Sequence, residues 1–353
     1  MKLRLDSSIG RLVQDTHLPE ELGFGKFFCP IMVKGVYRNE EWQTLELVPY
    51  SSITLDPATM IFHYGQSIFE GLKAYRNQSE LHLFRPFDHA KRFNLSAERM
   101  AMPPFPEECF LESAVQFCRA SSPLLPEGDN YNLYLRPFMI ATQVGLGVRP
   151  ADSYNFLLIG SPSQKYFSVP GGVKVMIERE WRRAASPGGT GGVKTAGNYA
   201  ASLLSDRRIK KLGFHQSLWL DSAKGQFVEE MTGMNFFAFL RDTLVTPPLG
   251  DSILAGITRN SILFLAKELG LKVEEKPLHI EELIADIKKG ECSECFISGT
   301  AAGITAVELL GEADGRIYPL KSPDGPVTIQ LRNALVELQR ARRPAPTGWI
   351  VPV

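Results

Sequence analysis

A single lysine in a glycine-rich stretch is the residue of this chain best placed for covalent chemistry. Lys194 lies in Gly-Gly-Val-Lys-Thr-Ala-Gly-Asn-Tyr, residues 191–199, between a glycine-rich loop over 186–192 and a helix start predicted near Asn198. A solvated surface position is the usual state of a lysine. Here the side chain has ordered backbone on one side and flexible backbone on the other, which favours a chemical role. An amine held in this way forms Schiff bases with carbonyl compounds.

The same stretch comes close to a nucleotide-binding pattern. Residues 188–195 nearly match the phosphate-binding loop G-x-x-x-x-G-K-[ST], but Val193 stands where that pattern needs a glycine. A β-carbon there obstructs the cradle of backbone N–H groups, and no clear magnesium-binding Asp strand follows. A nucleotide-binding protein is therefore the weaker alternative. It predicts tight binding of ATP with magnesium and a colourless protein.

Other segments carry the groups that pyridoxal phosphate needs from a protein. Its aldehyde needs a lysine, its phosphate needs N–H groups, hydroxyls and an arginine, and its ring nitrogen needs a carboxylate. Glu230, at the end of a predicted strand, supplies the carboxylate, and Arg92, on a predicted helix, supplies the planar fork that binds oxygens bidentately. The helix start at 255–260 and the turn at 296–302 offer N–H groups and threonine hydroxyls. Taken singly, each is also an ordinary surface charge, cap or turn.

The elements that must position these groups change type along the chain. Strands are expected in the first half at 31–37, 60–63, 70–75, 81–84, 132–142 and 154–161. Helices are expected there from about Pro86 and from about Pro106. In the second half strands are expected at 173–178, 217–220, 227–231 and 235–240, and helices at 200–211, 258–269, 279–289 and 327–340. The helix at 258–269 is expected to have Thr258 as its N-cap. This succession favours the α+β class.

Length and composition predict a soluble chain of two domains. A chain of 353 residues is long for one core, and the stretch 161–172 is rich in Pro, Ser and Gly. We expect a small N-terminal domain over 1–163, a linker over 164–172 and a larger C-terminal domain over 173–353. The chain is 44% hydrophobic with a net charge of zero and no basic block, which argues against a nucleic-acid partner. With no apolar run long enough for a bilayer and no apolar signal core, a cytoplasmic enzyme is expected.

The cysteines do not suggest a disulfide framework or a metal site. Five cysteines are too few for a framework in a chain of this length. Cys292 and Cys295 form a Cys-x-x-Cys, but neither a second pair nor a His-x-x-x-His accompanies it, which argues against zinc. The residues after them have the pattern of a buried strand. We therefore interpret both as packed thiols.

Taken together, these segments resemble the fold-type IV pyridoxal-phosphate enzymes, and most closely the branched-chain amino acid aminotransferases. The resemblance covers nearly the whole chain, from about Phe24 to Leu309. The matching runs occur in the family's order and are 63–75 (HYGQSIFEGLKAY), 84–92, 133–137, 194–199, 230–235, 256–258 and 298–302. The resemblance implies a two-domain fold, with a smaller N-terminal α/β domain and a larger C-terminal domain that has a mixed, barrel-like sheet and flanking helices. It also implies a homodimer.

The resemblance implies a role for each matching residue. Lys194 would be the Schiff-base lysine and proton shuttle, and Glu230 would pair with the pyridine nitrogen. Tyr199 would bind the phenolic oxygen of the ring. The phosphate would be held by Arg92, Thr258, Thr300 and the backbone of Ile257.

The substrate sites follow from the same resemblance. The substrate's α-carboxylate would meet the turn at Thr300 and Ala301. An apolar side-chain pocket would be formed by Phe28, Tyr64 and Tyr134. Arg136 would bind the distal carboxylate of glutamate, and its i, i+2 spacing from Tyr134 puts both on one face of a strand.

The activity that the resemblance implies is reversible, ping-pong transamination. L-Leucine, L-isoleucine and L-valine would exchange their amino group with 2-oxoglutarate, giving branched-chain 2-oxo acids and L-glutamate. D-Amino acid aminotransferase and aminodeoxychorismate lyase share the fold and are the alternatives, and the run 63–75 argues against both. Some animal members carry a redox Cys-x-x-Cys directly after the Gly-Thr-Ala turn. Here those positions are Ala302 and Thr305, so no redox control is carried over.

Overall fold

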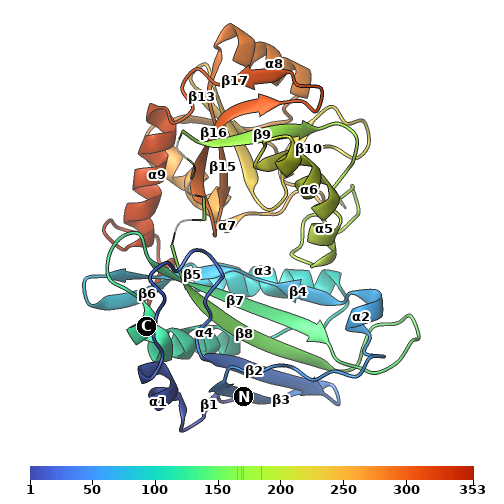
Figure 1. Cartoon of the computed structure of the whole chain (residues 1–353), viewed down its shortest axis with the longest axis vertical. Helices are drawn as coiled ribbons and strands as arrows, with labels where there is room; N and C mark the ends of the chain where they lie inside the picture. Colours follow the sequence, from blue (N-terminus) through green and yellow to red (C-terminus); the bar gives the residue numbers. More distant parts are fainter. Residues whose placement is uncertain (165, 168, 170, 184) are drawn as a thin grey trace. The chain divides into compact units, whose positions relative to one another are not determined.

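The computed structural model describes every residue of the chain except residues 165, 168, 170 and 184. It divides into two compact units (Figure 1). Unit 1 consists of Met1–Tyr166, Lys194–Ala196 and Leu338–Val353, and unit 2 of Phe167–Val193 and Gly197–Glu337. Of the predicted linker over 164–172, residues 165, 168 and 170 lie outside the described residues.

Unit 1 is built on a nine-stranded sheet in the order β1-β3-β2-β8-β7-β5-β6-β18, with β4 paired to β7. Its strands are β1 (Arg4–Leu5), β2 (Ile31–Arg38), β3 (Glu41–Pro49), β4 (Ser67–Phe69), β5 (Leu72–Asn77), β6 (Glu80–Phe84), β7 (Asn132–Ala141), β8 (Tyr154–Ser163) and β18 (Ile350–Pro352). The pairing of β1 with β3 is parallel, and the others are antiparallel. Because β18 pairs with β6, the chain's last residues group with unit 1, whereas the predicted division put them in the C-terminal domain.

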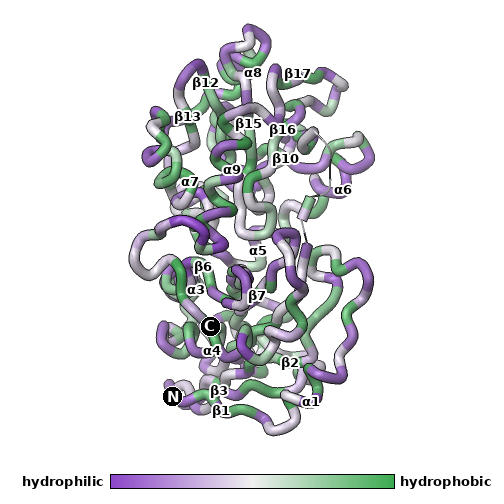
Figure 2. The backbone as a smooth tube through the Cα atoms, turned by 90° about the vertical axis from the view of Figure 1, so that its left-hand side faces the viewer, coloured by the Kyte–Doolittle hydropathy of each residue, from purple (hydrophilic) through white to green (hydrophobic). Residues whose placement is uncertain are grey.

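The helices of unit 1 bury two kinds of side chain. They are α1 (Ile9–Gln14), α2 (Ile61–Tyr64), α3 (Pro86–Arg99), α4 (Glu107–Ser121) and the 3₁₀ turn η1 (Ser122–Leu124). Helix α3 starts with Pro86 in its first turn, and its apolar residues Ala90, Phe93 and Ala97 join the core of the sheet. A second buried stripe on α3 is polar and consists of His89, Arg92 and Ser96. Figure 2 shows the hydrophobic stretches of β2 and β3, which supply further core residues.

Unit 2 is built on a mixed nine-stranded sheet in the order β11-β10-β9-β16-β15-β12-β13-β14, with β17 paired to β16. Its strands are β9 (Val173–Glu178), β10 (Gln216–Leu220), β11 (Val228–Met231), β12 (Asn235–Leu240), β13 (Thr243–Thr246), β14 (Lys272–Glu275), β15 (Cys292–Gly299), β16 (Gly303–Gly311) and β17 (Ile317–Pro319). A further pairing of β11 with β12 closes the path from β11 to β12 into a ring. Both parallel and antiparallel pairings occur, as the α+β class with a barrel-like mixed sheet predicts.

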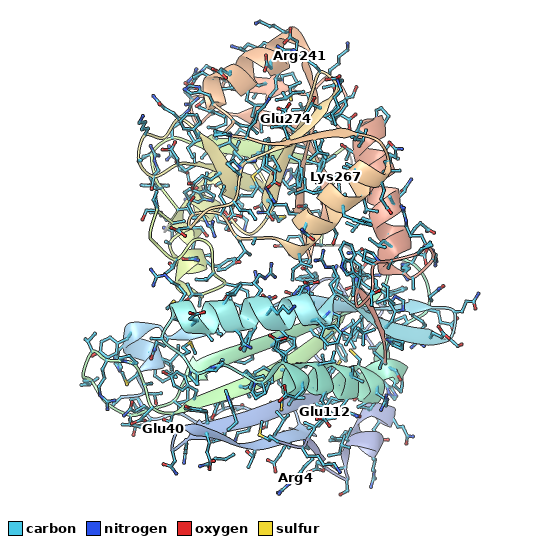
Figure 3. The ribbon with its side chains drawn as sticks, turned by 180° about the vertical axis from the view of Figure 1, so that it is seen from behind. Arg4, Glu40, Glu112, Arg241, Lys267 and Glu274 are labelled. Carbon is cyan, nitrogen blue, oxygen red and sulfur yellow. The ribbon has the colours of Figure 1, made fainter. Side chains whose placement is uncertain are left out.

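Helices flank the ring of unit 2, and exposed charged residues lie outside it. The helices of unit 2 are α5 (Gly197–Ala200), α6 (Leu203–Lys211), α7 (Ile257–Glu268), α8 (Ile280–Lys289) and α9 (Pro326–Gln339), the last of which continues into unit 1. Arg241 and Glu274, both labelled in Figure 3, are among the exposed charges of unit 2. Among the described residues, no helix combines the length and hydropathy needed to cross a bilayer.

Three sequence-based expectations about elements are wrong. The strand expected at 60–63 is the short helix α2, which ends at Gly65 in a left-handed conformation. The helix expected at 200–211 is broken into α5 and α6. Helix α7 begins at Ile257, and its N-cap is Gly256, two residues before the predicted N-cap Thr258, which lies inside the first turn.

Candidate active site

Lys194 is anchored by its backbone within unit 1. The Phe69 N–H donates to the Lys194 carbonyl at 3.0 Å, and Thr195 forms a bridge with Ile68 of β4. The Lys194 N–H donates to the hydroxyl of Ser96 on α3 at 2.9 Å. The Lys194 ammonium nitrogen lies 4.6 Å from the centre of the Phe69 ring. The lysine is therefore fixed to a strand and a helix of one core.

The glycine-rich loop before this lysine is packed against protein rather than open to a ligand. The N–H groups of Gly188 and Gly192 donate to the carboxylate and the carbonyl of Asp251, at 3.0 and 2.6 Å. A β-carbon at Gly191 would lie 2.6 Å from the Cα of Ser252, so close packing alone requires a glycine there. These N–H groups do not form the converging cradle of a nucleotide-binding loop, which weakens that alternative.

Asn198 closes the loop within unit 2. Its amide donates to the carbonyls of Thr190 at 2.7 Å and Val193 at 3.0 Å, and its oxygen accepts from the Thr190 hydroxyl at 2.8 Å. Asn198 is buried at the start of α5, close to the helix start predicted there. The residues directly before Lys194 are thus ordered by side-chain bonds that the glycine pattern alone does not reveal.

Arg92 lies in a buried polar cluster of unit 1. Its Nε and Nη2 donate to the two oxygens of Glu70 at 2.6 and 2.8 Å, and His89 Nδ1 donates to Glu70 at 2.8 Å. The exposed fractions are 0% for Glu70, 2% for His89 and 8% for Arg92. Burial alone would raise the pKa of Glu70, but the charge of Arg92 and the hydrogen bonds outweigh it and hold that pKa well below its usual range.

Tyr134 and Arg136 lie side by side on β7, as their spacing predicts. Arg136 Nη2 donates to the Tyr134 hydroxyl at 2.9 Å, and its guanidinium lies 4.7 Å from the centre of the Phe69 ring. Among the described side chains, Arg136 Nε is buried without a hydrogen-bond partner. Because Phe69 also contacts Lys194, the predicted catalytic amine and the predicted carboxylate-binding guanidinium both lie close to this one ring.

The other predicted pocket residues have different partners. Phe28 is 41% exposed and stacks on Tyr50 at 6.0 Å between ring centres. Tyr64 donates its hydroxyl to the Leu146 carbonyl. Tyr134 is instead contacted edge to face, at 4.9 Å between ring centres, by Phe24, which was not among the predicted pocket residues.

Glu230 is a buried carboxylate held from several sides in unit 2. It accepts from Arg183 Nη1, from Asn235 Nδ2 at 3.0 Å and from the Leu254 N–H at 3.3 Å. Its neighbour Glu229 is also buried. Burial raises the pKa of Glu229. Arg183, the charged partner of Glu230, was not predicted.

Three adjacent strands bring the other cofactor residues of unit 2 towards Glu230. Glu230 on β11 pairs in register with Asn235 on β12, which pairs with Ser298 on β15. Ser298 precedes the turn that holds Thr300, and among the described side chains its hydroxyl is buried without a partner. A β-carbon at Gly256 would lie 2.0 Å from the Asn235 side-chain oxygen, so the start of α7, with Ile257 and Thr258, packs on this same asparagine.

Tyr199 lies close to the turn that joins the strand of Glu230 to the strand of Asn235. A β-carbon at Gly233, in the turn between β11 and β12, would contact the Tyr199 ring at 3.4 Å. A β-carbon at Gly299 would lie 3.1 Å from Met234 of that turn, so the turns at 233 and 300 are neighbours. Unit 2 therefore gathers Glu230, Tyr199, Ile257, Thr258 and Thr300, and unit 1 gathers Lys194, Arg92, Tyr134 and Arg136.

Cys292 and Cys295 are buried in the core of unit 2. Their sulfurs lie 3.6 Å apart, and both side chains belong to one hydrophobic cluster. Burial raises the pKa of Cys295 well above its usual range, because the thiolate form is disfavoured there. Both residues are free thiols, in agreement with their interpretation as packed cysteines.

Comparison with known proteins gives a consistent result. The family pattern described as amino-transferase class IV matches residues 67–310. The branched-chain-amino-acid aminotransferase of Mycolicibacterium smegmatis is 44% identical over 338 residues, covering 93% of this chain and 91% of that protein.

Solved structures agree with the sequence comparison. The branched-chain aminotransferase of the archaeon Thermoproteus uzoniensis, solved with norvaline, matches with a TM-score of 0.75 and 27% identity over 91% of this chain and 99% of that one. The T.th. branched-chain amino acid aminotransferase, solved with N-(5'-phosphopyridoxyl)-L-glutamate, matches with a TM-score of 0.73 and 27% identity, covering 90% and 97% of the two chains.

Proposed function

The chain belongs to the class IV aminotransferases, within their branched-chain-amino-acid aminotransferase family, and we propose that it exchanges amino groups between branched-chain amino acids and 2-oxoglutarate. The substrates are L-leucine, L-isoleucine and L-valine, and the products are their 2-oxo acids and L-glutamate. The observation that supports this most is Glu230, a carboxylate buried beside Arg183 and Asn235 in the ring of unit 2. A buried carboxylate with a cationic partner is the group that a protonated pyridine nitrogen requires.

The described residues fit pyridoxal phosphate as the cofactor. The Ser298 hydroxyl, which has no partner among the described side chains, the threonine-bearing turn after it and the glycine at the start of α7 together suit an anionic group, because hydroxyls and helix N-termini bind phosphates. The neighbouring carboxylate Glu230 suits a protonated ring nitrogen at the other end of the same molecule. When bound, pyridoxal phosphate supplies an electron-withdrawing ring that stabilises negative charge at the substrate's α-carbon.

Each residue then has a defined task. Lys194 would supply the amine that holds the aldehyde and, once released, would carry the proton of the substrate's α-carbon to the C4′ carbon of the cofactor. Glu230 would keep the ring nitrogen protonated, which makes the electron sink effective. Tyr199 would donate to the phenolic oxygen. The phosphate would be held by Arg92, Thr258, Thr300 and the backbone of Ile257.

The paired contact of Tyr134 with Arg136 supports a site for two unlike side chains. With leucine bound, Arg136 keeps the Tyr134 hydroxyl as its partner, and the apolar side chain gains about 1.5–3 kcal/mol from burial among Tyr134, Tyr64 and Phe28. With glutamate bound, its distal carboxylate accepts from Arg136 in a charge-assisted bond. The α-carboxylate of either substrate binds at Thr300 and Ala301.

Replacement of the lysine tests the assignment. We expect Lys194→Ala to bind pyridoxal phosphate weakly and to form no glutamate from L-leucine and 2-oxoglutarate, as measured by chromatography of both products. Lys267→Ala, at an exposed position on α7, is the matched control and should keep the wild-type rate. Normal turnover by Lys194→Ala would refute the proposal. Activity with D-alanine or a chorismate-derived amine, but not with L-leucine, would instead favour the related enzymes of this fold.

The assembly and location are further parts of the proposal. We expect a homodimer, because the resemblance on which the activity rests implies that assembly, and we expect it in the cytoplasm, as the sequence predicts. Light scattering on the purified protein measures its mass in solution. A mass of one chain, 39.3 kDa, at working concentrations would contradict the dimer.

A further inference from the structure

We propose that Glu70 is a positioning residue which, together with His89, holds Arg92 in the orientation that binds the phosphate of the cofactor. This inference rests on the proposed function, because it takes Arg92 as a phosphate-binding residue. It adds residues to which neither the sequence motifs nor the comparisons assign a role.

The contact between Glu70 and Arg92 fixes the plane of the guanidinium. Oε1 of Glu70 accepts from Nε at 2.6 Å and Oε2 accepts from Nη2 at 2.8 Å, so both oxygens bind along one edge of the fork. A single hydrogen bond would leave the guanidinium free to rotate, whereas two parallel ones do not. The end of the fork formed by its two terminal nitrogens is the edge that a phosphate would take.

Glu70 is itself fixed, so it can serve as a rigid reference for Arg92. Its Oε2 also accepts from His89 Nδ1 at 2.8 Å and from the Gly71 N–H at 3.1 Å. Its own N–H donates to the Pro137 carbonyl of β7 at 2.8 Å. The carboxylate is fully buried. Glu70 is therefore held to the sheet by its backbone N–H and to α3 by the hydrogen bond from His89.

The same face of α3 also carries the anchor of the catalytic lysine. Ser96 lies one turn beyond Arg92 and donates its hydroxyl to the Arg92 carbonyl at 3.0 Å. The same hydroxyl accepts the Lys194 N–H at 2.9 Å. Holding Arg92 on α3 therefore also fixes it relative to Lys194. A cofactor attached at its aldehyde and its phosphate needs these two anchors at a constant separation.

A purely structural role for this buried ion pair is the competing explanation. Buried pairs often contribute little net stability, and breaking one leaves an uncompensated charge. A structural role predicts equal losses of affinity for cofactor forms with and without a phosphate. A positioning role predicts a loss confined to the form that has the phosphate.

The test compares the binding of pyridoxal phosphate with that of pyridoxal by the full-length, cofactor-free protein. The dissociation constant of pyridoxal divided by that of pyridoxal phosphate, from absorbance titrations, measures phosphate recognition alone. We expect Glu70→Gln, which keeps the shape and removes the charge, to lower this ratio by about tenfold or more. Pyridoxal affinity should stay within about threefold of the wild type. His89→Asn should cause a smaller loss of the same ratio, because it removes one bond to Glu70.

Two control variants separate the possible failures. Glu294→Gln removes another buried carboxylate, in unit 2, and should lower stability without changing the ratio. Arg92→Gln should abolish phosphate preference, and adding Glu70→Gln to it should cause no further loss. An unchanged ratio in folded Glu70→Gln, or equal losses for both ligands, would overturn the positioning role. If Glu70→Gln does not fold, an unchanged ratio in His89→Asn overturns it. An unchanged ratio in Arg92→Gln would instead refute the phosphate role of Arg92 in the proposed function.

Discussion

Glu230 and Arg183 form a deeply buried contact of opposite charges in unit 2. We expect Arg183→Gln to lower kcat by about tenfold or more with little change in KM for leucine, because a buried carboxylate without its cation becomes protonated. A neutral acid would no longer keep the ring nitrogen charged. Steady-state kinetics over a range of pH measure this effect. Arg182→Gln is the control, since Arg182 donates to backbone carbonyls instead. Equal kcat values for wild type and Arg183→Gln would contradict the role.

The neighbouring arginines show what sequence reasoning at this scale cannot supply. Arg182 and Arg183 are adjacent and identical in type, yet only Arg183 is buried against Glu230. Residue types made Lys194, Glu230 and Arg92 candidates, because the chemistry of the cofactor demands those types, and the resemblance to a known family selected them. Partners such as Arg183 and Glu70 depend on tertiary packing, so no signal in one sequence distinguishes them from surface charges.

The buried cluster of Glu70 and His89 predicts a loss of stability in acid. The pKa of Glu70 lies below its ordinary value near 4.5, so the unfolded state binds the proton more readily and the free energy of unfolding falls as pH drops through that value. Burial also lowers the pKa of His89 from 6.5. The unfolded state therefore also takes up this proton more readily, so the free energy of unfolding already falls as the pH drops through about 6.5. The free energy of unfolding, measured with urea at about pH 7, 5.5 and 4, should show this decline. In Glu70→Gln the part of the decline at the most acidic pH, which comes from Glu70, should be absent. Parallel curves for both proteins would contradict it.

At the scale of elements, helix α3 joins two functional segments through a serine. Ser96 accepts the Lys194 N–H, whereas Ser113 on α4 donates to the Cys109 carbonyl of its own helix and, within the described part of the chain, holds no other segment. We expect Ser96→Ala to lower the free energy of unfolding by about 1–3 kcal/mol and to lower kcat, because the Lys194 N–H loses this acceptor. Ser113→Ala should leave kcat unchanged. Similar kcat values for the two variants would show that Ser96 does not position the lysine.

Long periodic segments were the most predictable elements, and short apolar ones the least. The helices from Pro86 and Pro106 and the strand at 173–178 were predicted closely, because each has a clear start signal or period. The four residues of α2 are too few for a period of about 2 to be distinguished from one of about 3.6. The polar buried stripe of α3 was missed because polar residues on a helix are ordinarily assigned to its solvent face.

At the scale of the whole molecule, the chain's end returns to its first unit. β18 pairs with β6, and the Arg85 guanidinium lies 3.9 Å from the centre of the Trp349 ring. We expect deletion of residues 348–353 to increase hydrogen exchange in β6 by about tenfold or more, because the strand loses its partner and its edge becomes exposed. Exchange in β15 of unit 2 should not change, and it serves as the internal control. Unchanged protection of β6 would contradict this account.

Composition predicted a boundary between two parts of the chain, but not that the last residues of the chain belong to the first unit. The stretch 161–172 was predicted to be a boundary because Pro, Ser and Gly mark linkers, and the first segment of unit 1 consists of Met1–Tyr166. The return of Leu338–Val353 and of Lys194–Ala196 to unit 1 depends on pairing with β6 and β4. Such non-local pairing leaves no mark on local composition.

The central claim is that this chain transfers amino groups by means of a lysine-bound pyridoxal phosphate. The most direct measurement is the absorption spectrum of the purified protein with added pyridoxal phosphate, before and after L-leucine and then after 2-oxoglutarate. We predict a visible band that collapses with L-leucine and returns with 2-oxoglutarate. A protein that gains no band, or a band that L-leucine leaves unchanged, would contradict the claim.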